Sequence, residues 1–407
     1  MADAITRSGR MEHTRNVHPC CSQTKELGMR INIALILALL MACGSPDGPA
    51  GGETEAGAEY RAADVELAIV DSIGVEHGDS NLVLGTTAAC CCLPEGRVAV
   101  ADMDRCRVGV FTRKGEFLRS VGRPGSGPGE FMMPGAAAVT PSGGLAVSDF
   151  GAMKLVLFDS DLIYAGELGG FFPAPPQNLI FLDDSSFVGR TVAYETGGET
   201  MEAGFLVGRW EVGSAQPEVV YARELAPFDP QDMFNTEAPE ILFTASADGI
   251  VYICARSTEE FVFGAWNPDG SELFTVSEPY RREAKTREEL ELERQLMREL
   301  FTSRGVPAEM VESIEPEPYR YAIGGLGIAP DGNLWVREGA RRHPVFRVYH
   351  PASGEYLHTV SMDSTAYRGE LEVRMNNWGF TAWDAMSRDW PRVYVLETVS
   401  TSEASDT

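Results

Sequence analysis

Basic residues are scarce in this chain of 407 residues. Lys and Arg number 34 against 60 Asp and Glu, and the formal net charge is −26. An anionic surface repels phosphate groups at long range, so we expect no nucleic acid among the partners of the chain. The remaining composition, 44% hydrophobic and 23% charged, is that of a folded protein with one large domain or two ordinary ones.

Residue patterns for catalysis and metal binding are missing. The histidines that follow residue 42 are never spaced as H-x-H or H-x-x-x-H, and no Asp-rich loop has the spacing of a calcium hand. Gly78-Asp79-Ser80-Asn81 matches the start of a GDS-type esterase motif, but no Asp-x-x-His follows to supply the base. We therefore assign no metal ligand and expect no cofactor. Calcium held by carboxylates from separate parts of the chain is the alternative.

Long apolar runs are missing too. The stretch INIALILALLMA at residues 31–42 is too short to span a membrane and has the length of the hydrophobic region of a signal peptide. Cys43 follows it at once. The chain therefore carries a targeting segment rather than a membrane-spanning helix.

The segment LMAC at residues 40–43 resembles the cleavage site of bacterial lipoproteins, with a small residue before the cysteine. The resemblance implies that residues 29–42 are a lipoprotein signal peptide and that acyl chains on Cys43 hold the protein on a membrane of the cell envelope. Ser45, where an aspartate would retain such proteins at the inner membrane, favours the outer membrane or its periplasmic face. An ordinary secretory signal with an accidental cysteine is the alternative.

The segments outside the repeat region lack the pattern of a folded domain. Residues 1–28 are polar and are interpreted as a misassigned extension, because Met29 is the more natural start. Residues 44–59 lack large apolar groups, so we predict a flexible tether over 43–62 and a disordered tail over 401–407.

A repeat dominates the chain from Val65 onward. Each copy has a small-residue strand, a turn of the type P-x-G or D-G, an alternating strand, a loop, a strand ending in an aromatic residue, and a fourth strand. The spacing of most copies matches one four-stranded propeller blade, and two longer steps need insertions. The first turns of the six copies fall at Gly96, Gly143, Asp184, Gly249, Gly332 and Asn376.

The two ends of the repeat region predict how the ring closes. The last copy supplies only three strands, whereas residues 65–73, VELAIVDSI, form a strand without a blade. As the outer strand of the last blade, this segment would remove two exposed sheet edges. We therefore predict an all-β fold, a six-bladed β-propeller over residues 63–400 closed by an N-terminal strand.

These copies resemble six-bladed β-propellers of the NHL-repeat kind, including bacterial lipoproteins that carry them. The most specific piece is VGRPGSGPGEFMMP at residues 121–134, because similar proteins place a G-x-G-P-G-E-F segment at this junction. Gly125, Gly127 and Gly129 are interpreted as turn residues rather than a phosphate loop, since no Gly-Lys-Ser/Thr follows and the next element is a strand.

One insertion has the pattern of an amphipathic helix. In TREELELERQLMRELFTSRG, residues 286–305, Thr286 and Glu289 form a capping box, and leucines form an apolar stripe with Met297. We place this insertion, residues 280–318, between blades four and five. It should partly cap the face that carries the loops between second and third strands.

Basic side chains gather in the loops expected on that face. On a chain of this net charge they suit an anionic ligand such as a carboxylate, a sugar acid or a phosphate, and pairing with nearby Asp and Glu is the alternative. The candidate ligand-binding residues are Asp104, Arg105, Arg107, Arg123, Lys154, Arg256, Arg337, Arg341, Arg342 and His343.

Cysteines cluster on one predicted inner strand. Cys90, Cys91 and Cys92 are consecutive, and Cys106 belongs to the same blade. Adjacent residues of a strand point to opposite faces, and small thiols suit the crowded centre of a propeller. Buried free thiols are therefore favoured over a Cys92–Cys106 disulfide, which an oxidising envelope would permit.

Two functional hypotheses follow. The first is a monomeric, membrane-anchored propeller that binds a protein or a small anionic ligand without chemistry of its own. The second is a lactonase-like hydrolase or a lyase with a metal in the channel, which needs Asp, Glu, Asn or His from several blades at the channel mouth.

Replacing Cys43 by Ser tests the anchor. Because the acyl chains would have no attachment point, C43S should move from the membrane fraction to the soluble fraction. Fractionation followed by immunoblotting measures this shift. An unchanged distribution would refute lipidation at Cys43.

Overall fold

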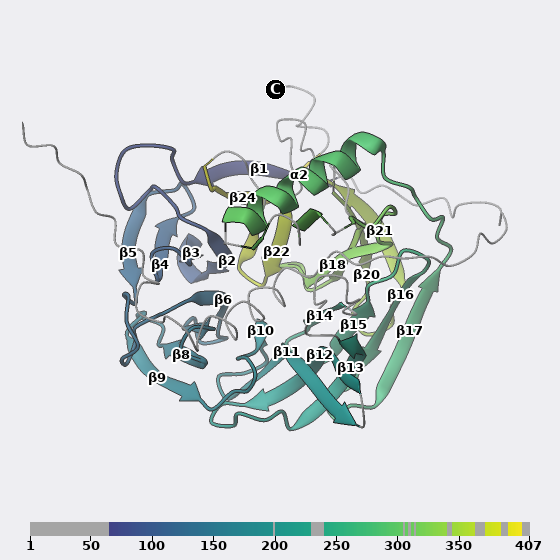
Figure 1. Ribbon diagram of the computed structural model, residues 1–407, viewed down its shortest axis with the longest axis horizontal. Helices are drawn as coiled ribbons and strands as arrows, with labels where there is room; N and C mark the ends of the chain where they lie inside the picture. The colour runs from purple at the N-terminus through teal and green to yellow at the C-terminus, as the bar shows by residue number, and fades with distance from the viewer. Residues whose placement is uncertain are drawn as a thin grey trace, which may run out of the picture.

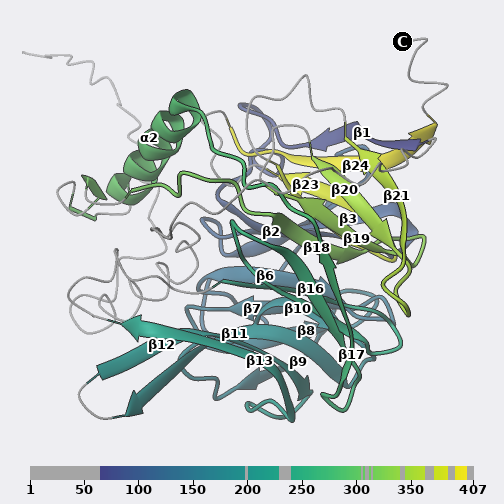
Figure 2. The ribbon, with the colours of Figure 1, turned by 90° about the vertical axis from the view of Figure 1, so that its right-hand side faces the viewer.

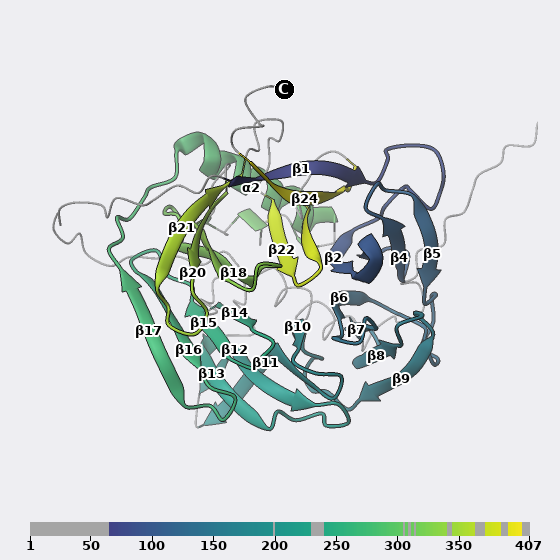
Figure 3. The ribbon, with the colours of Figure 1, turned by 180° about the vertical axis from the view of Figure 1, so that it is seen from behind.

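The computed structural model describes residues 65–197, 200–228, 240–303, 306–307, 311–312, 315–339, 344–362, 371–383 and 390–400. The predicted signal peptide, Cys43, the tether and the tail lie outside these residues. In this part of the chain, six four-stranded antiparallel sheets stand as blades around a common axis (Figures 1 and 3). The predicted six-bladed β-propeller is confirmed.

The first three blades follow one another along the chain. Blade one consists of β2 (Thr87–Leu93), β3 (Arg97–Asp102), β4 (Arg107–Thr112) and β5 (Phe117–Val121). Blade two consists of β6 (Pro134–Val139), β7 (Leu145–Asp149), β8 (Lys154–Phe158) and β9 (Tyr164–Gly169). Blade three consists of β10 (Gln177–Phe181), β11 (Ser186–Gly197), β12 (Thr200–Glu211) and β13 (Val219–Phe228).

The last three blades include the closing strand. Blade four consists of β14 (Ile241–Ala245), β15 (Val251–Ala255), β16 (Phe261–Trp266) and β17 (Glu272–Glu278). Blade five consists of β18 (Ile323–Ile328), β19 (Leu334–Glu338), β20 (Val345–Tyr349) and β21 (Tyr356–Ser361). Blade six consists of β22 (Glu372–Asn376), β23 (Gly379–Trp383), β24 (Val393–Ser400) and β1 (Val65–Ile73), in the order β22-β23-β24-β1.

The turns between first and second strands have the predicted glycines. Gly96, Gly143, Gly249 and Gly332 have φ of 67°, 89°, 87° and 80°, in the left-handed region that glycine enters without steric cost. Blade three has no glycine there. Instead the Asp183 carboxylate accepts a hydrogen bond from its own chain two residues on, in an Asx turn with an N···O distance of 2.7 Å.

Ring closure is also as predicted. β1 pairs antiparallel with β24 from Val65 opposite Ser400 to Ile73 opposite Val393, with one register shift between Ile69 and Asp71. Chain segments from the two ends of the described region therefore lie side by side in blade six (Figure 1).

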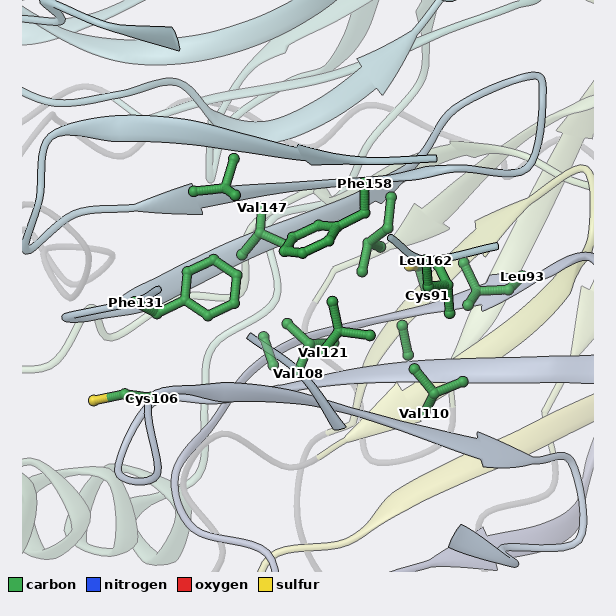
Figure 4. Close-up of a cluster of buried hydrophobic side chains, with 14 residues drawn as sticks. Cys91, Leu93, Cys106, Val108, Val110, Val121, Phe131, Val147, Phe158 and Leu162 are labelled. Atoms are coloured by element: carbon green, nitrogen blue, oxygen red, sulfur yellow. The ribbon is translucent and has the colours of Figure 1, made fainter. Parts of the chain in front are cut away.

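Adjacent blades pack face to face through apolar layers. Figure 4 shows one of them, in which Val108, Val110 and Val121 of blade one face Phe131 and residues of blade two. Phe131 has no exposed surface, so the end of the glycine-rich junction anchors the connection between these blades in the core. The buried thiols of Cys91 and Cys106 belong to the same cluster.

The insertion between blades four and five contains helix α2 (Arg287–Ser303). The predicted capping box forms: the Thr286 N–H donates to Glu289 Oε2 at 2.8 Å, and the Glu289 N–H donates to Thr286 Oγ1 at 3.3 Å. Met297 is buried, as is Phe301 one turn on. No helix in the described residues is long and apolar enough to cross a membrane.

The closing strand predicts a sharp difference between two substitutions in β1. Leu67 is fully buried, so Leu67→Ala should lower the free energy of unfolding by about 2–5 kcal/mol through lost burial and a residual cavity. Val70 is 41% exposed, and Val70→Ala should change it by less than about 0.5 kcal/mol. Urea unfolding of both variants measures this, and equal losses would contradict the packing of β1.

Candidate functional site

One side of the ring carries both the loops between second and third strands and the connections between blades; we call it the loop face. Figure 2 shows α2 and the ends of β11 and β12 projecting on this same side. In Figure 1 the helix lies in front of the ring, over the sector of blades five and six. The insertion therefore emerges on the face expected from the sequence.

The candidate residues of blade one contact their own blade and the segment that precedes it. Asp104 accepts hydrogen bonds from the Thr86 N–H at 2.7 Å and from Thr86 Oγ1 at 2.9 Å. Arg105 donates to the carbonyl of Ser80, and its Nε lies 3.6 Å from Asp102. Arg107 donates to Asn81 and Ser120 instead. These side chains join the loop between β3 and β4 to the segment between β1 and β2.

In the glycine-rich junction, the basic candidate residue pairs with a carboxylate of the junction itself. Glu130 accepts the Gly127 N–H at 2.9 Å and ion-pairs with Arg123 at 2.8 Å. The hydrogen bond from Gly127 and the charge of Arg123 lower the pKa of this carboxyl below its ordinary value. Lys154, which is buried, donates to the carbonyl of Gly127 at 2.9 Å and pairs with Glu167 at 2.8 Å. The junction is a closed turn structure, in agreement with its interpretation from the sequence.

The remaining candidates belong to blades four and five. Arg337 is 3% exposed and donates to the carbonyl of Leu371 at 2.8 Å, which ties blade five to blade six. Arg256 pairs with Glu240 and stacks on Tyr321, with 4.3 Å from Cζ to the ring centroid. Arg341, Arg342 and His343 lie outside the described residues.

A buried ionic chain joins blades three and four. Glu240, immediately before β14, pairs with Arg256 and with Arg190 of β11, whose Nη1 lies 3.4 Å from Oε1. Burial by itself would raise the pKa of Glu240, but Arg256 and Arg190 together hold it below its ordinary value. Arg190 also stacks on Phe205 at 4.5 Å. Arg190 could not be singled out from the sequence, because its ionic partner Glu240 lies 50 residues away in the next blade.

The same arginine reaches the inner strand of its blade. Arg190 Nη2 donates to Gln177 Oε1 at 3.2 Å, and Gln177 is 2% exposed. Among the described residues, neither Gln177 Nε2 nor Arg190 Nε has a hydrogen-bond partner. Two buried donors are therefore unsatisfied at the loop-side end of β10.

Charged residues are scarce on the six inner strands that the structure describes. The inner strands read TAACCCL, PGAAAV, QNLIF, ILFTA, IGGLGI and EVRMN, so Arg374 is the single basic residue on them and Glu372 the single acidic one. Arg374 Nη2 donates to Asn178 Oδ1 at 3.2 Å, from blade six to blade three. These blades stand on opposite sides of the ring, so the contact spans the channel (Figure 1).

A cleft of about 190 Å³ lies where the insertion leaves the ring. Arg347 Nε and Glu338 pair at 2.6 Å in its wall, and the Tyr280 hydroxyl donates to the carbonyl of Arg320 at 3.1 Å. Arg281 is exposed and has no ion pair among the described residues. The cleft is lined by Pro279, Tyr280, Arg281, Glu283, Arg320, Tyr321, Ala322, Glu338, Gly339 and Arg347.

The cysteines within the described residues are free and buried, as favoured from the sequence. Burial raises the pKa of Cys90 and of Cys254 to about 12, and that of Cys92 to about 11. Thiolates are the reactive form, so these thiols are poor nucleophiles at neutral pH. In the described ranges, no group of three or more His, Cys, Asp or Glu side chains is placed to hold a metal ion.

Comparison with known proteins agrees with this architecture. Residues 71–170 match the model of the DUF5128 family, described as a 6-bladed beta-propeller. All strands of blades one and two fall in that range. No curated protein sequence matches the chain.

Solved structures are similar at low sequence identity. One is a protein from Bacteroides fragilis described as exported, at 11% identity over 83% of this chain and 98% of that chain, with a TM-score of 0.45. Another is a member of the duf4221 family from Bacteroides vulgatus, at 7% identity over 83% and 99%, with a TM-score of 0.46. A third is a catalytically inactive virginiamycin B lyase from Staphylococcus aureus, at 11% identity over 82% and 95%, with a TM-score of 0.36.

Removing the shared carboxylate tests the ionic chain. Glu240→Gln should lower the free energy of unfolding by about 3 kcal/mol near neutral pH, because it leaves buried guanidinium groups without this partner. A folded-state pKa below the unfolded value means that the carboxylate stabilises above about pH 4.5 and that this contribution disappears as the pH falls through the lowered pKa. The difference between wild type and variant should therefore shrink on acidification.

Urea unfolding at a series of pH values measures this difference. The matched control is Glu218→Gln, which removes the partner of Arg209 from a pair of 2.7 Å whose carboxylate is 56% exposed. It should cost less than about 1 kcal/mol at any pH. A pH-independent loss in the Glu240 variant would contradict the proposed ionisation.

Proposed function

We propose that this protein is a membrane-anchored propeller of the cell envelope, of the NHL-repeat kind, that binds an anionic ligand on its loop face without chemistry of its own. The anchor is the lipidated Cys43, at the outer membrane or facing the periplasm. The ligand is a small oxyanion-bearing molecule or an acidic group on a protein partner.

The observation that carries this proposal is the charge arrangement of the loop face. Most candidate cations are bound to carboxylates or carbonyls, but Arg281 stands exposed at the cleft without an ion pair among the described residues. From Tyr321 in the cleft wall, contacts run through Arg256, Glu240 and Arg190 to the channel. Arg281 therefore offers an exposed positive charge at the cleft, on a chain whose net charge is −26.

The build of this face also supports binding. Helix α2 and the long β11–β12 hairpin rise above the blades on the loop side only (Figure 2). The opposite face consists of short turns such as those at Gly96 and Gly332. The helix and the hairpin therefore form walls beside the cleft and the channel mouth. A ligand bound between such walls can bury much of its own surface.

A charge-reversal pair tests the proposal. Purified full chain carrying C43S should gain thermal stability saturably with sodium phosphate or sodium succinate, beyond sodium chloride of equal ionic strength. Arg281→Glu should raise the half-saturating concentration several-fold at low ionic strength, because it replaces a positive charge at the cleft, which attracts the anion, by a negative one. Thermal-shift titration measures the midpoint.

The matched control is Lys114→Glu. Lys114 is likewise an exposed cation without an ion pair among the described residues, but it lies in the turn between β4 and β5 on the opposite face. Lys114→Glu should leave the half-saturating concentration of each anion unchanged. Equal effects of the two reversals, or no stabilisation beyond that of chloride, would refute anion binding on the loop face.

A further inference from the structure

We propose that the loop-side end of the central channel is an oxyanion site, in which Arg374 with Gln177 and Asn178 holds the carboxylate or phosphate group of a small ligand. This inference rests on the proposed function and names the group that contacts the ligand. It uses residues that are not among the loop cations predicted from the sequence.

The first observation is the state of Arg374. Its contacts with the described residues are to neutral groups: the amide oxygen of Asn178 at 3.2 Å and the ring of Trp383 at 5.7 Å from Cζ. No carboxylate of the described residues lies within ion-pair distance, although Glu372 is two residues away on the same strand. A guanidinium has five N–H donors in a planar fork, and the fork matches the two oxygens of a carboxylate or phosphate.

The second observation is the backbone at Asn178. Its φ is +50°, in the left-handed region, although it lies inside an inner strand. The β10–β11 pairing shifts its register between Gln177 and Ile180, so the strand is bulged at this residue. Blades one, two and five have an equivalent register shift at the start of their inner strands, but no residue at those shifts has a positive φ. Residues with such a backbone concentrate at functional sites. Here the distortion accompanies a contact with the blade across the channel.

The third observation is the pair of unsatisfied donors next to Asn178. Gln177 is 2% exposed and Arg190 is 8% exposed, and Gln177 Nε2 and Arg190 Nε have no partner among the described residues. A buried donor without an acceptor costs about 1–3 kcal/mol. The charged oxygens of a carboxylate or phosphate are strong acceptors, so its binding would satisfy donors that the protein leaves open.

The electrostatics agree with these contacts. Burial, first of all, lowers the pKa of Arg190, and the neighbouring charges of Arg374 and Arg256 lower it further against the pull of Glu240. Like charges are therefore held near one another at this end of the channel. A bound anion would reduce the repulsion between these arginines. The apolar residues of the other inner strands would limit the number of water molecules that compete for the anion.

The test is the loss of oxyanion stabilisation in two variants of the full chain carrying C43S. Arg374→Met removes the guanidinium and keeps the apolar stem, and Asn178→Gly removes the amide while accepting the positive φ. Each should raise the half-saturating concentration of sodium phosphate or sodium succinate at least tenfold at matched ionic strength. Isothermal titration calorimetry gives the affinity, and comparison of the two anions separates phosphate from carboxylate ligands.

The matched control is Arg119→Met. Arg119 also donates to neutral acceptors only, the carbonyls of Asp161 and Leu162, but it lies on the outer strand of blade one. It should bind both anions as the wild type does. If Arg374→Met does not fold, Asn178→Gly decides the question. Wild-type affinity in the folded variants would refute the channel site and leave anion binding elsewhere on the loop face intact, whereas no binding by the wild type would refute the proposed function itself.

Discussion

The antiparallel pairing of β1 with β24 is the contact on which the rest of the molecule depends. A propeller blade buries its faces only against two neighbours, so an open ring would expose two apolar sheet faces and two strand edges. Joining the ends of the described chain fixes the position of every blade about the axis. Residues as distant in sequence as Asn178 and Arg374 are then brought into contact across the channel.

Side chains at the loop-side ends of the second strands hold their own loops in blades one and two, whereas blade three differs from both. In blade one the register pairs Thr87 with Asp102, and in blade two it pairs Pro134 with Asp149. Both carboxylates accept backbone N–H groups of the adjoining loops, as from Gly85 at 3.0 Å in blade one. These carboxylates hold their loops and are not available to a ligand.

Blade three has an arginine at the equivalent position. The register pairs Gln177 with Arg190, so a guanidinium replaces the carboxylate. The bulge at Asn178 and the unsatisfied Gln177 amide occur at the same place. Blades one, two and five have a similar register shift, so the features particular to blade three are the arginine, the positive φ of Asn178 and the unsatisfied Gln177 amide. These three features lie in one strand pair and together support a site more strongly than any of them alone.

The sequence predicted the architecture because the signals for it are local. Turn glycines such as Gly96 and Gly332 and alternating strands recur in each copy, and the unpaired segment 65–73 indicated the closing strand. Blade three was the weakest copy, since its Asx turn at Asp183 lacks the glycine signal. The site residues could not be found in this way, because the contacts of Arg190 with Glu240 and of Arg374 with Asn178 join different blades.

Counting cations in loops also overestimates the positive potential of a surface. Arg123 and Lys154 were credible ligand residues from the sequence, but Glu130 and Glu167 neutralise them. A paired charge at the surface attracts little beyond a Debye length of about 8–10 Å. Arg374 differs because it is partly buried and its partners are neutral. In a channel of small apolar side chains its field is screened less than that of a surface arginine, so one such residue outweighs several exposed ones in selecting an anion.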